Sequence, residues 1–514
     1  MRQIVNIFRK DVRHLRLELI ASLAVLLLFC VAEPKAWAEW PAGPATNTSG
    51  ILVFLLFASW SILILRLVHA ERLAGLNQFW TTRPYEWPSL LAAKVGFVLA
   101  FVYVPLALAQ FYLIHHGGFE IGVNLPLMLL NLVRLTSTFV LPMACIAVVT
   151  TSFGQATLSL VGIAAGFASL EVAFSYIGRE SATLGLQRNE PLFLIPLEMA
   201  IAVVLFSAAL LLQYRGRTTR RAIVLLGVTA VLLVATQMVL TGSPAAAAGY
   251  PVVVADAPAS IAVDAGPAAE IRLVIPKNPR TAVYKIPLVF SDFAPGAGLS
   301  RQAKRYTLTA ADGYTWTSQW LNDYSDYGGL APKTGETVAH SWSSIDVPWQ
   351  VHDRLVGGPV SIRMEFLVSQ LKDGAPHSIS METDDQQVPD VGVCALDESG
   401  GMVTCRAAFG QSDFVTAKTF GTYGGCDASA GSPPQLVPAS GVLRGRMRNE
   451  TPLPSISPVE VSGVVVRGAR DGSPGDLCPG VPMTFTAKIL QRRLYLATAS
   501  ATIVLKDRPG SVGP

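Results

Sequence analysis

The distribution of long apolar runs is the feature that most constrains how this chain can fold. A membrane-spanning helix needs about 20 predominantly apolar residues, and such runs recur before residue 240 but not after it. Charged residues make up 15% of the chain and hydrophobic residues 51%, whereas soluble domains carry about 25% charged residues. The sequence therefore excludes a wholly soluble multidomain protein. It predicts a polytopic α-helical membrane bundle followed by a water-soluble region.

Seven apolar segments have the character of membrane spans. They are 17–32, 51–69, 93–114, 125–150, 156–177, 191–212 and 222–240. A leader, 1–16, precedes them, and a Gly-, Pro- and Ala-rich linker, 241–249, joins them to the C-terminal region, 250–514. Because Ala36-Trp37-Ala38 follows the short first run, cleavage of a signal peptide is an open alternative to a first span.

The basic residues indicate an orientation. With a cytoplasmic N-terminus, twelve Lys and Arg residues fall in inside segments and three in outside loops, as the positive-inside rule favours. Seven spans then place 250–514 on the outer side of the cell membrane. The net charge of +4 is small, so we expect no nucleic-acid partner.

The leader has the pattern of a two-faced helix. Its apolar side chains share one face, its basic side chains share the other, and Asp11 is an exception on the apolar face. We expect this helix to lie at the membrane interface with its basic face toward anionic lipid headgroups. A simple positively charged leader is the alternative.

The longest cytoplasmic loop contains a second amphipathic pattern. Apolar side chains recur at helical spacing from residue 71 to 82, and Arg83-Pro84 ends the pattern because the residue before proline avoids helical geometry. We expect this helix to be a docking surface for a partner chain. Its docking residues are Glu71, Arg72, Leu73, Gly75, Leu76, Phe79 and Trp80. The alternative is a helix that only lies on lipid, anchored by Trp80 and Trp87.

Together these features resemble the permease subunits of type-2 ABC transporters. The residues that carry the resemblance are Glu71, Gly75 and Pro84 after the second span and Lys94 at the start of the third. It covers roughly residues 1–217, and it implies a six-span exporter bundle whose segment 71–82 is a coupling helix docked on a separate ABC ATPase. It also implies that permease subunits pair as a homodimer or heterodimer. The seventh span and the C-terminal region depart from the family pattern.

Two observations bear on transport. The sequence has no G-x-x-x-x-G-K-[ST] motif, so a nucleotide would be bound by another chain. Arg134, Glu171 and Glu198 lie inside predicted spans at depths that agree within ~5 Å. Such residues usually pair or face a polar cavity. We interpret them as a polar patch on a substrate path, with a purely structural ion pair as the alternative.

The C-terminal region has the pattern of an all-β, sandwich-like fold of one or two domains. Short alternating or β-branched runs are separated by Gly and Pro. The runs are 269–275, 282–290, 306–309, 360–368, 377–381, 459–466 and 483–490, followed by 494–505.

The cysteines of this region predict disulfides. A turn centred on Ser399-Gly400 places Cys394 directly opposite Cys405 on a hairpin. We therefore expect a Cys394–Cys405 disulfide, and with it a Cys426–Cys478 disulfide, with free thiols as the alternative. Cys30 and Cys145 lie in apolar runs, where we expect ordinary packing.

Aromatic side chains are concentrated near residue 316. Tyr314, Trp316 and Trp320 share one strand face if the segment is extended. An exposed row would suit stacking on a sugar or polymer, and packing in the core is the alternative. The sequence has no H-E-x-x-H or G-x-S-x-G motif, so we expect neither an enzyme nor a metal or cofactor.

Two functional hypotheses follow. The first is a permease subunit of an ABC-type exporter that moves an unknown substrate with energy from a separate ATPase. The second is a membrane-anchored β-sandwich protein that binds or senses a ligand outside the membrane and does not transport.

Overall fold

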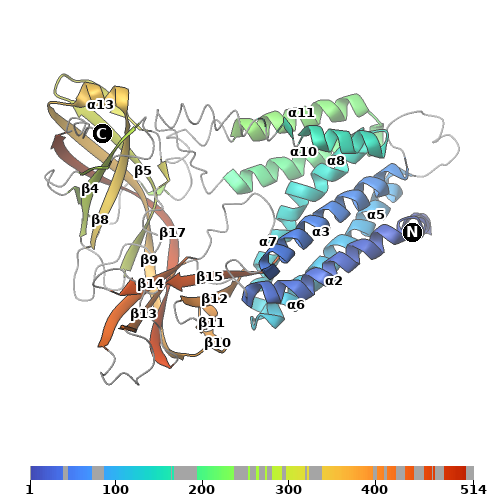
Figure 1. Cartoon of the computed structure of the whole chain (residues 1–514). Helices are drawn as coiled ribbons and strands as arrows, with labels where there is room; N and C mark the ends of the chain where they lie inside the picture. The colour runs from blue at the N-terminus through green and yellow to red at the C-terminus, as the bar shows by residue number, and fades with distance from the viewer. Residues whose placement is uncertain are drawn as a thin grey trace, which may run out of the picture.

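The structure is a computed structural model with an N-terminal helical region and a C-terminal region of strands in several sheets (Figure 1). This confirms the predicted change of fold class along the chain. The residues that the structure describes are 2–38, 44–71, 86–163, 165–166, 169, 194–236, 253–254, 262–265, 272–274, 281–291, 297–318, 321–322, 339–396, 402–409, 414–423, 435–444, 456–465, 467–468 and 480–504.

The helical region contains two long composite helices beside simple ones. Helices α5, η1 and α6 join end to end, as do α7, η2 and α8. The bounds are α1 (Arg2–His14), α2 (Arg16–Ala38), α3 (Pro44–His69), α5 (Trp87–Val98), η1 (Leu99–Tyr103), α6 (Val104–His116), α7 (Ile121–Leu135), η2 (Thr136–Val140), α8 (Leu141–Val149), α10 (Leu194–Gly216) and α11 (Thr219–Ala235).

Among the described residues, five helices are long and apolar enough to cross a membrane. They are Arg16–Trp37, Pro44–His69, Trp87–His116, Ile121–Val149 and Leu197–Gly216. The other two predicted spans correspond to shorter elements. Helix α11 has 17 residues, and the apolar helix Phe153–Ile163 is shorter still. The structure thus supports a membrane-embedded protein, and the count of seven spans remains a prediction.

Two π-helical segments interrupt the composite helices for a physical reason. Each is followed by a proline at the second position of the next helix, Pro105 after η1 and Pro142 after η2. Proline has no N–H to donate and its ring crowds the preceding turn, so a widened π turn relieves both problems. The hydroxyls of Tyr103 in η1 and Thr136 in η2 hydrogen-bond to each other, which ties the two interruptions together.

The largest sheet of the C-terminal region has nine strands. Its order is β16-β14-β13-β17-β9-β5-β6, with β1 on β17 and β7 on β5. The bounds are β1 (Val253–Val254), β5 (Ala297–Ala310), β6 (Thr315–Thr317), β7 (Leu321–Asn322), β9 (Pro359–Met381), β13 (Phe414–Tyr423), β14 (Gln435–Arg444), β16 (Arg467–Gly468) and β17 (Val481–Val504).

Two four-stranded sheets complete the region. One contains β2 (Ala262–Ala265), β3 (Arg272–Val274), β4 (Thr281–Ser291) and β8 (Ala339–Pro348), which leads into the short helix α13 (Trp349–Leu355). The other has the order β10-β11-β12-β15. Its bounds are β10 (Gln386–Val388), β11 (Gly392–Leu396), β12 (Met402–Ala408) and β15 (Val459–Val465).

Strands β9 and β17 contribute to two separate hydrophobic cores. In the first, Phe366 of β9 packs with Phe290 of β4 and Tyr306 of β5. In the second, Phe485 of β17 packs with Val403 of β12. The β9–β17 pairing shifts register between Thr486 and Lys488 and again between Leu490 and Leu494. These irregularities allow one pair of strands to serve both cores, because a bulge bends and twists a strand.

The predicted hairpin disulfide is confirmed. Cys394 of β11 lies opposite Cys405 of β12, and the two form a disulfide that is buried in the second core. Cys426 and Cys478 lie outside the described residues, so the second predicted disulfide is untested. Cys30 and Cys145 are buried in the helical region, as expected for small hydrophobic side chains.

We expect loss of the Cys394–Cys405 disulfide to destabilise the second core. The double substitution Cys394→Ala/Cys405→Ala should lower the free energy of unfolding of the C-terminal region by about 2–3 kcal/mol, because the unfolded loop is no longer constrained. The measurement is the urea midpoint of the full-length protein, followed through the tryptophans. Cys145→Ala is the control and should leave that midpoint unchanged; equal midpoints in the double variant and the wild type would contradict the prediction.

Candidate functional site

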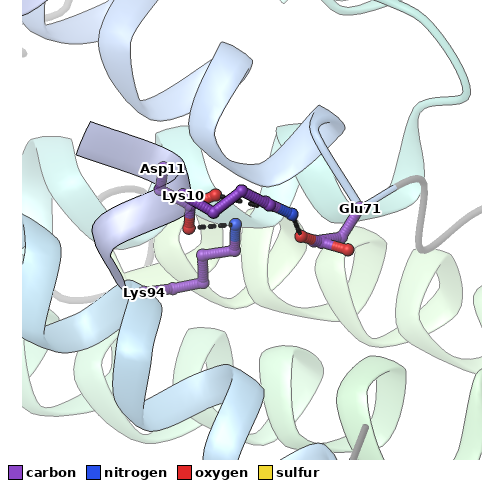
Figure 2. A network of polar contacts seen from close by, with 4 residues as sticks. All are labelled: Lys10, Asp11, Glu71 and Lys94. Carbon is purple, nitrogen blue, oxygen red and sulfur yellow. Dashed lines mark hydrogen bonds and ion pairs between the residues drawn. The ribbon is translucent and has the colours of Figure 1, made fainter. Parts of the chain in front are cut away.

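The amphipathic leader is held to the bundle by a buried ion pair. Asp11, the exception on the apolar face of α1, is fully buried and accepts a hydrogen bond from Lys94 Nζ of α5 at 2.7 Å (Figure 2). A charged side chain is buried only when it is paired. Asp11 therefore faces the bundle because Lys94 supplies its counter-charge there.

A second ion pair extends this contact to the end of α3. Lys10 Nζ donates to Glu71 Oε1 and lies 3.8 Å from Asp11 Oδ1. The side chains of Asp11 and Glu71 are 0% exposed and that of Lys94 is 5% exposed, while Lys10 reaches solvent at 38%. We call these four residues, Lys10, Asp11, Glu71 and Lys94, the inner network. Two cations balance two carboxylates, so the cluster carries no net charge.

Apolar side chains pack beside the inner network. Ile7 of α1, Leu65 of α3, Leu90 of α5 and Tyr214 of α10 belong to one buried cluster. Because this packing excludes water, the charges interact in surroundings of low polarity, where pairing is strong and a lost partner is costly. The inner network and the cluster together fix α1 against three other helices.

The inner network also lies at the start of the predicted docking segment. Glu71 is the first residue of that segment, and its buried carboxylate faces Lys10 rather than solvent. In this structure it ties the segment to α1 and does not offer a polar group to a partner. The remaining predicted docking residues, from Arg72 to Trp80, lie outside the described residues, and their role stays a prediction.

Other polar side chains of the helices have partners that sequence periodicity does not predict. Arg66 of α3 forms an ion pair with Glu18 of α2. Glu33 of α2, 7% exposed, accepts hydrogen bonds from Trp37 Nε1 at 3.1 Å and from Ser49 Oγ. The detectable signal was a charged residue inside an apolar run, which in a membrane calls for a partner.

The polar patch of Arg134, Glu171 and Glu198 stays a prediction. Glu171 lies outside the described residues. Cys145 Sγ of α8 donates to the carbonyl oxygen of Phe206 in α10 at 3.4 Å, so the helices that carry Arg134 and Glu198 are in contact. The pairing of Arg134 with Glu198 and a role in substrate movement stay predictions.

The far end of the bundle meets the C-terminal region in an apolar contact. Phe409, Ile456 and Val459 are buried in the same cluster as Leu113 of α6 and Phe119. Within this contact Gln110 Nε2 of α6 donates to the carbonyl oxygen of Ile456 at 3.2 Å. We call this contact the outer junction. It lies at the opposite end of the bundle from α1 (Figure 1).

Two residues of the predicted aromatic row, Tyr314 and Trp316, pack against the first core of the C-terminal region. Tyr314 and Trp316 share a face, as predicted, and both pack against the first core while the neighbouring Thr315 and Thr317 are exposed. The guanidinium of Arg354 covers the ring of Tyr314 at 3.9 Å. Trp320 lies outside the described residues. These positions favour the packing alternative for Tyr314, since a covered ring face cannot stack on a ligand.

A hydroxyl–backbone contact lies deeper in the same core. Tyr306 Oη donates to the carbonyl oxygen of Asp346 at 2.6 Å and accepts from its N–H at 2.9 Å. Burial raises the pKa of the Tyr306 hydroxyl, and burial also raises the pKa of the Asp346 carboxyl, against an opposing effect of Lys304. The hydroxyl therefore stays protonated and serves as a structural hydrogen-bonding group.

No metal-binding constellation is apparent in the part of the chain that the structure describes. No group of three or more His, Cys, Asp or Glu side chains there has a suitable arrangement. The acidic turn that includes Glu382 and Asp385 is partly neutralised, because Arg406 pairs with Asp385.

Comparisons with known proteins do not identify the chain. No protein-family model matches it, and no curated protein matches it. Among solved structures, a crystal structure of red sea bream transglutaminase is 5% identical, with a TM-score of 0.11. The match covers 48% of this chain and 31% of the transglutaminase chain. This chain thus spans about a third of that protein, and a likeness this weak carries no argument about fold or function.

We expect the Asp11–Lys94 pair to behave as a coupled unit. Lys94→Met should lower the free energy of unfolding by about 3–5 kcal/mol, because it leaves a buried carboxylate without its partner. The double variant Asp11→Leu/Lys94→Met should recover most of that loss, because both charges are then absent. The measurement is thermal unfolding of the detergent-solubilised full-length protein. A double variant that is less stable than either single variant would contradict direct pairing.

Proposed function

We propose that the chain is the permease subunit of an ABC-type exporter, driven by a separate ATPase chain. The observation that carries this proposal is the inner network. Ion pairs join α1 to α5 and to Glu71, just beyond the end of α3, at the point where the chain enters the predicted docking segment. A force applied to that segment would therefore act on three helices at once, as a transport subunit without a nucleotide site requires.

The membrane arrangement belongs to the same proposal. We infer seven spans, a cytoplasmic N-terminus and an extracytoplasmic C-terminal region of two sandwich-like lobes. The opposite ends of the bundle occupied by α1 and by the strands support this arrangement (Figure 1). We also infer that two permease subunits associate, as the resemblance to the ABC family implies, and we assign no catalytic role to the chain.

The end of the bundle that carries α1 is suited to anionic lipid. Exposed arginines lie on α1, at the start of α2 and around the turn between α10 and α11, while the acidic residue of α1 is buried. Clusters of arginine beside a membrane attract anionic headgroups. We infer that this surface rests on the cytoplasmic leaflet. The exposed arginines are Arg2, Arg9, Arg13, Arg16, Arg215, Arg217, Arg220 and Arg221.

One observation favours the second functional hypothesis, a membrane-anchored binding or sensing protein. The C-terminal region is seated directly on α6 through the outer junction, an arrangement that also suits relay of a signal from a bound ligand. The two hypotheses differ in whether an ATPase engages the opposite end of the bundle.

The docking segment provides the test of transport. We expect Gly75→Trp and Phe79→Asp each to abolish co-purification of a P-loop ATPase, together with its ATP hydrolysis, from native membranes. Both place an unsuitable side chain on the proposed contact. Arg215→Lys is the matched control, because it keeps the charge of an exposed residue at the same end of the bundle, and it should retain the ATPase. Unchanged ATPase affinity in Gly75→Trp and Phe79→Asp, with normal thermal unfolding, would leave the sensing hypothesis as the better account.

The orientation is tested separately by labelling single introduced cysteines in intact cells. Thr315→Cys, in an exposed position on β6, should react with a membrane-impermeant maleimide. Arg220→Cys, exposed near the start of α11, should react only after the cells are permeabilised. The wild-type protein gives the background from its native cysteines. Labelling of both variants before permeabilisation would contradict the proposed orientation.

A further inference from the structure

One helical span makes polar contacts at both ends of the bundle. The span Trp87–His116 is built from α5, η1 and α6. Near its start, Lys94 donates to Asp11 of α1 at 2.7 Å. Near its end, Gln110 donates to the carbonyl oxygen of Ile456 in the C-terminal region at 3.2 Å. Sixteen residues separate the two, which at 1.5 Å per residue is about 24 Å along the axis.

We propose that this span couples the inner network to the outer junction. A change in how α1 packs against the bundle then alters how the C-terminal region packs against it, and a change in the packing of the C-terminal region alters that of α1. The inference does not require transport, and it holds equally for a sensing protein. It rests on continuity: a helix is stiff along its axis, and the Lys94 and Gln110 side chains that make the contacts near its two ends are buried.

The buried contacts of Lys94 and Gln110 oppose movement of the span. Gln110 is 0% exposed, and the Lys94 side chain is 5% exposed. Neither side chain can exchange its partner for water without exposing or stranding a buried polar group, which costs free energy. A rotation or shift of the span is therefore opposed at both ends. When the contact at one end is lost, the span moves more easily, and the contact at the other end is disturbed more often.

The π segment η1 gives the span a second possible arrangement. A π turn contains one more residue per hydrogen-bonded turn than an α turn, so moving it by one turn rotates the intervening residues by about 100°. The Tyr103–Thr136 hydrogen bond holds η1 against η2 of the neighbouring span. Coupling between distant sites requires an element with discrete alternatives, and the paired π segments supply one at mid-span.

Hydrogen exchange of the full-length protein in lipid nanodiscs tests the proposal. Lys94→Met, and the milder Asp11→Asn, should increase amide exchange of β15 (Val459–Val465) about fivefold or more, within the usual range of coupling between sites. Strand β4 (Thr281–Ser291), which belongs to the first core of the C-terminal region, should exchange as in the wild type. Tyr103→Phe should increase exchange of both β15 and α1.

Two further variants distinguish coupling through the span from a general loss of stability. Arg66→Met breaks the Glu18–Arg66 pair in the same half of the bundle without touching the span, and it should leave β15 unchanged. Gln110→Leu should increase exchange of α1, because coupling between two sites is reciprocal. Increased exchange of α1 with an unchanged β15 in Lys94→Met and Asp11→Asn would overturn the proposal. So would an equal increase in β15 and β4, or an increase in β15 in Arg66→Met.

Discussion

The Asp11–Lys94 ion pair is the interaction on which the organisation of the α1 end of this bundle depends. An amphipathic helix that merely rests on lipid needs no acid on its apolar face. Here the acid is present, fully buried and matched by a lysine of a different helix. The leader is consequently part of the bundle's packed structure. Its basic face remains outward, where it is free to meet headgroups.

The pair also places Lys10 within reach of Glu71, and this second contact gives the end of α3 a defined position. At the far end, an apolar contact that includes a buried hydrogen bond holds the C-terminal region against α6. The molecule thus combines a charged attachment at one end with a largely apolar one at the other. The difference matters because breaking the charged contact leaves a buried charge without its partner, whereas apolar contacts weaken on cooling.

Local patterns in the sequence were sufficient for several features. Apolar length identified the helical region, and the symmetric turn at Ser399-Gly400 predicted the pairing of Cys394 with Cys405, since hairpin register depends on nearby residues alone. Asp11 was recognised as an exception on its helix, but its partner was not, because Lys94 is 83 residues away and sequence periodicity carries no information on such contacts. For the same reason Glu71 was expected to face a partner, whereas it is buried against Lys10.

The placement of β17 in the largest sheet has a consequence for biosynthesis. This strand lies between β9 and β13 and contributes to both cores, yet it is the last of the described strands to be made. Until residue 504 has been synthesised, β9 and β13 have open edges where β17 will pair, and neither core is closed. Open edges invite pairing with other chains. The C-terminal region therefore completes its fold only after β17 has been made, and until then it depends on being kept apart from other unpaired strands.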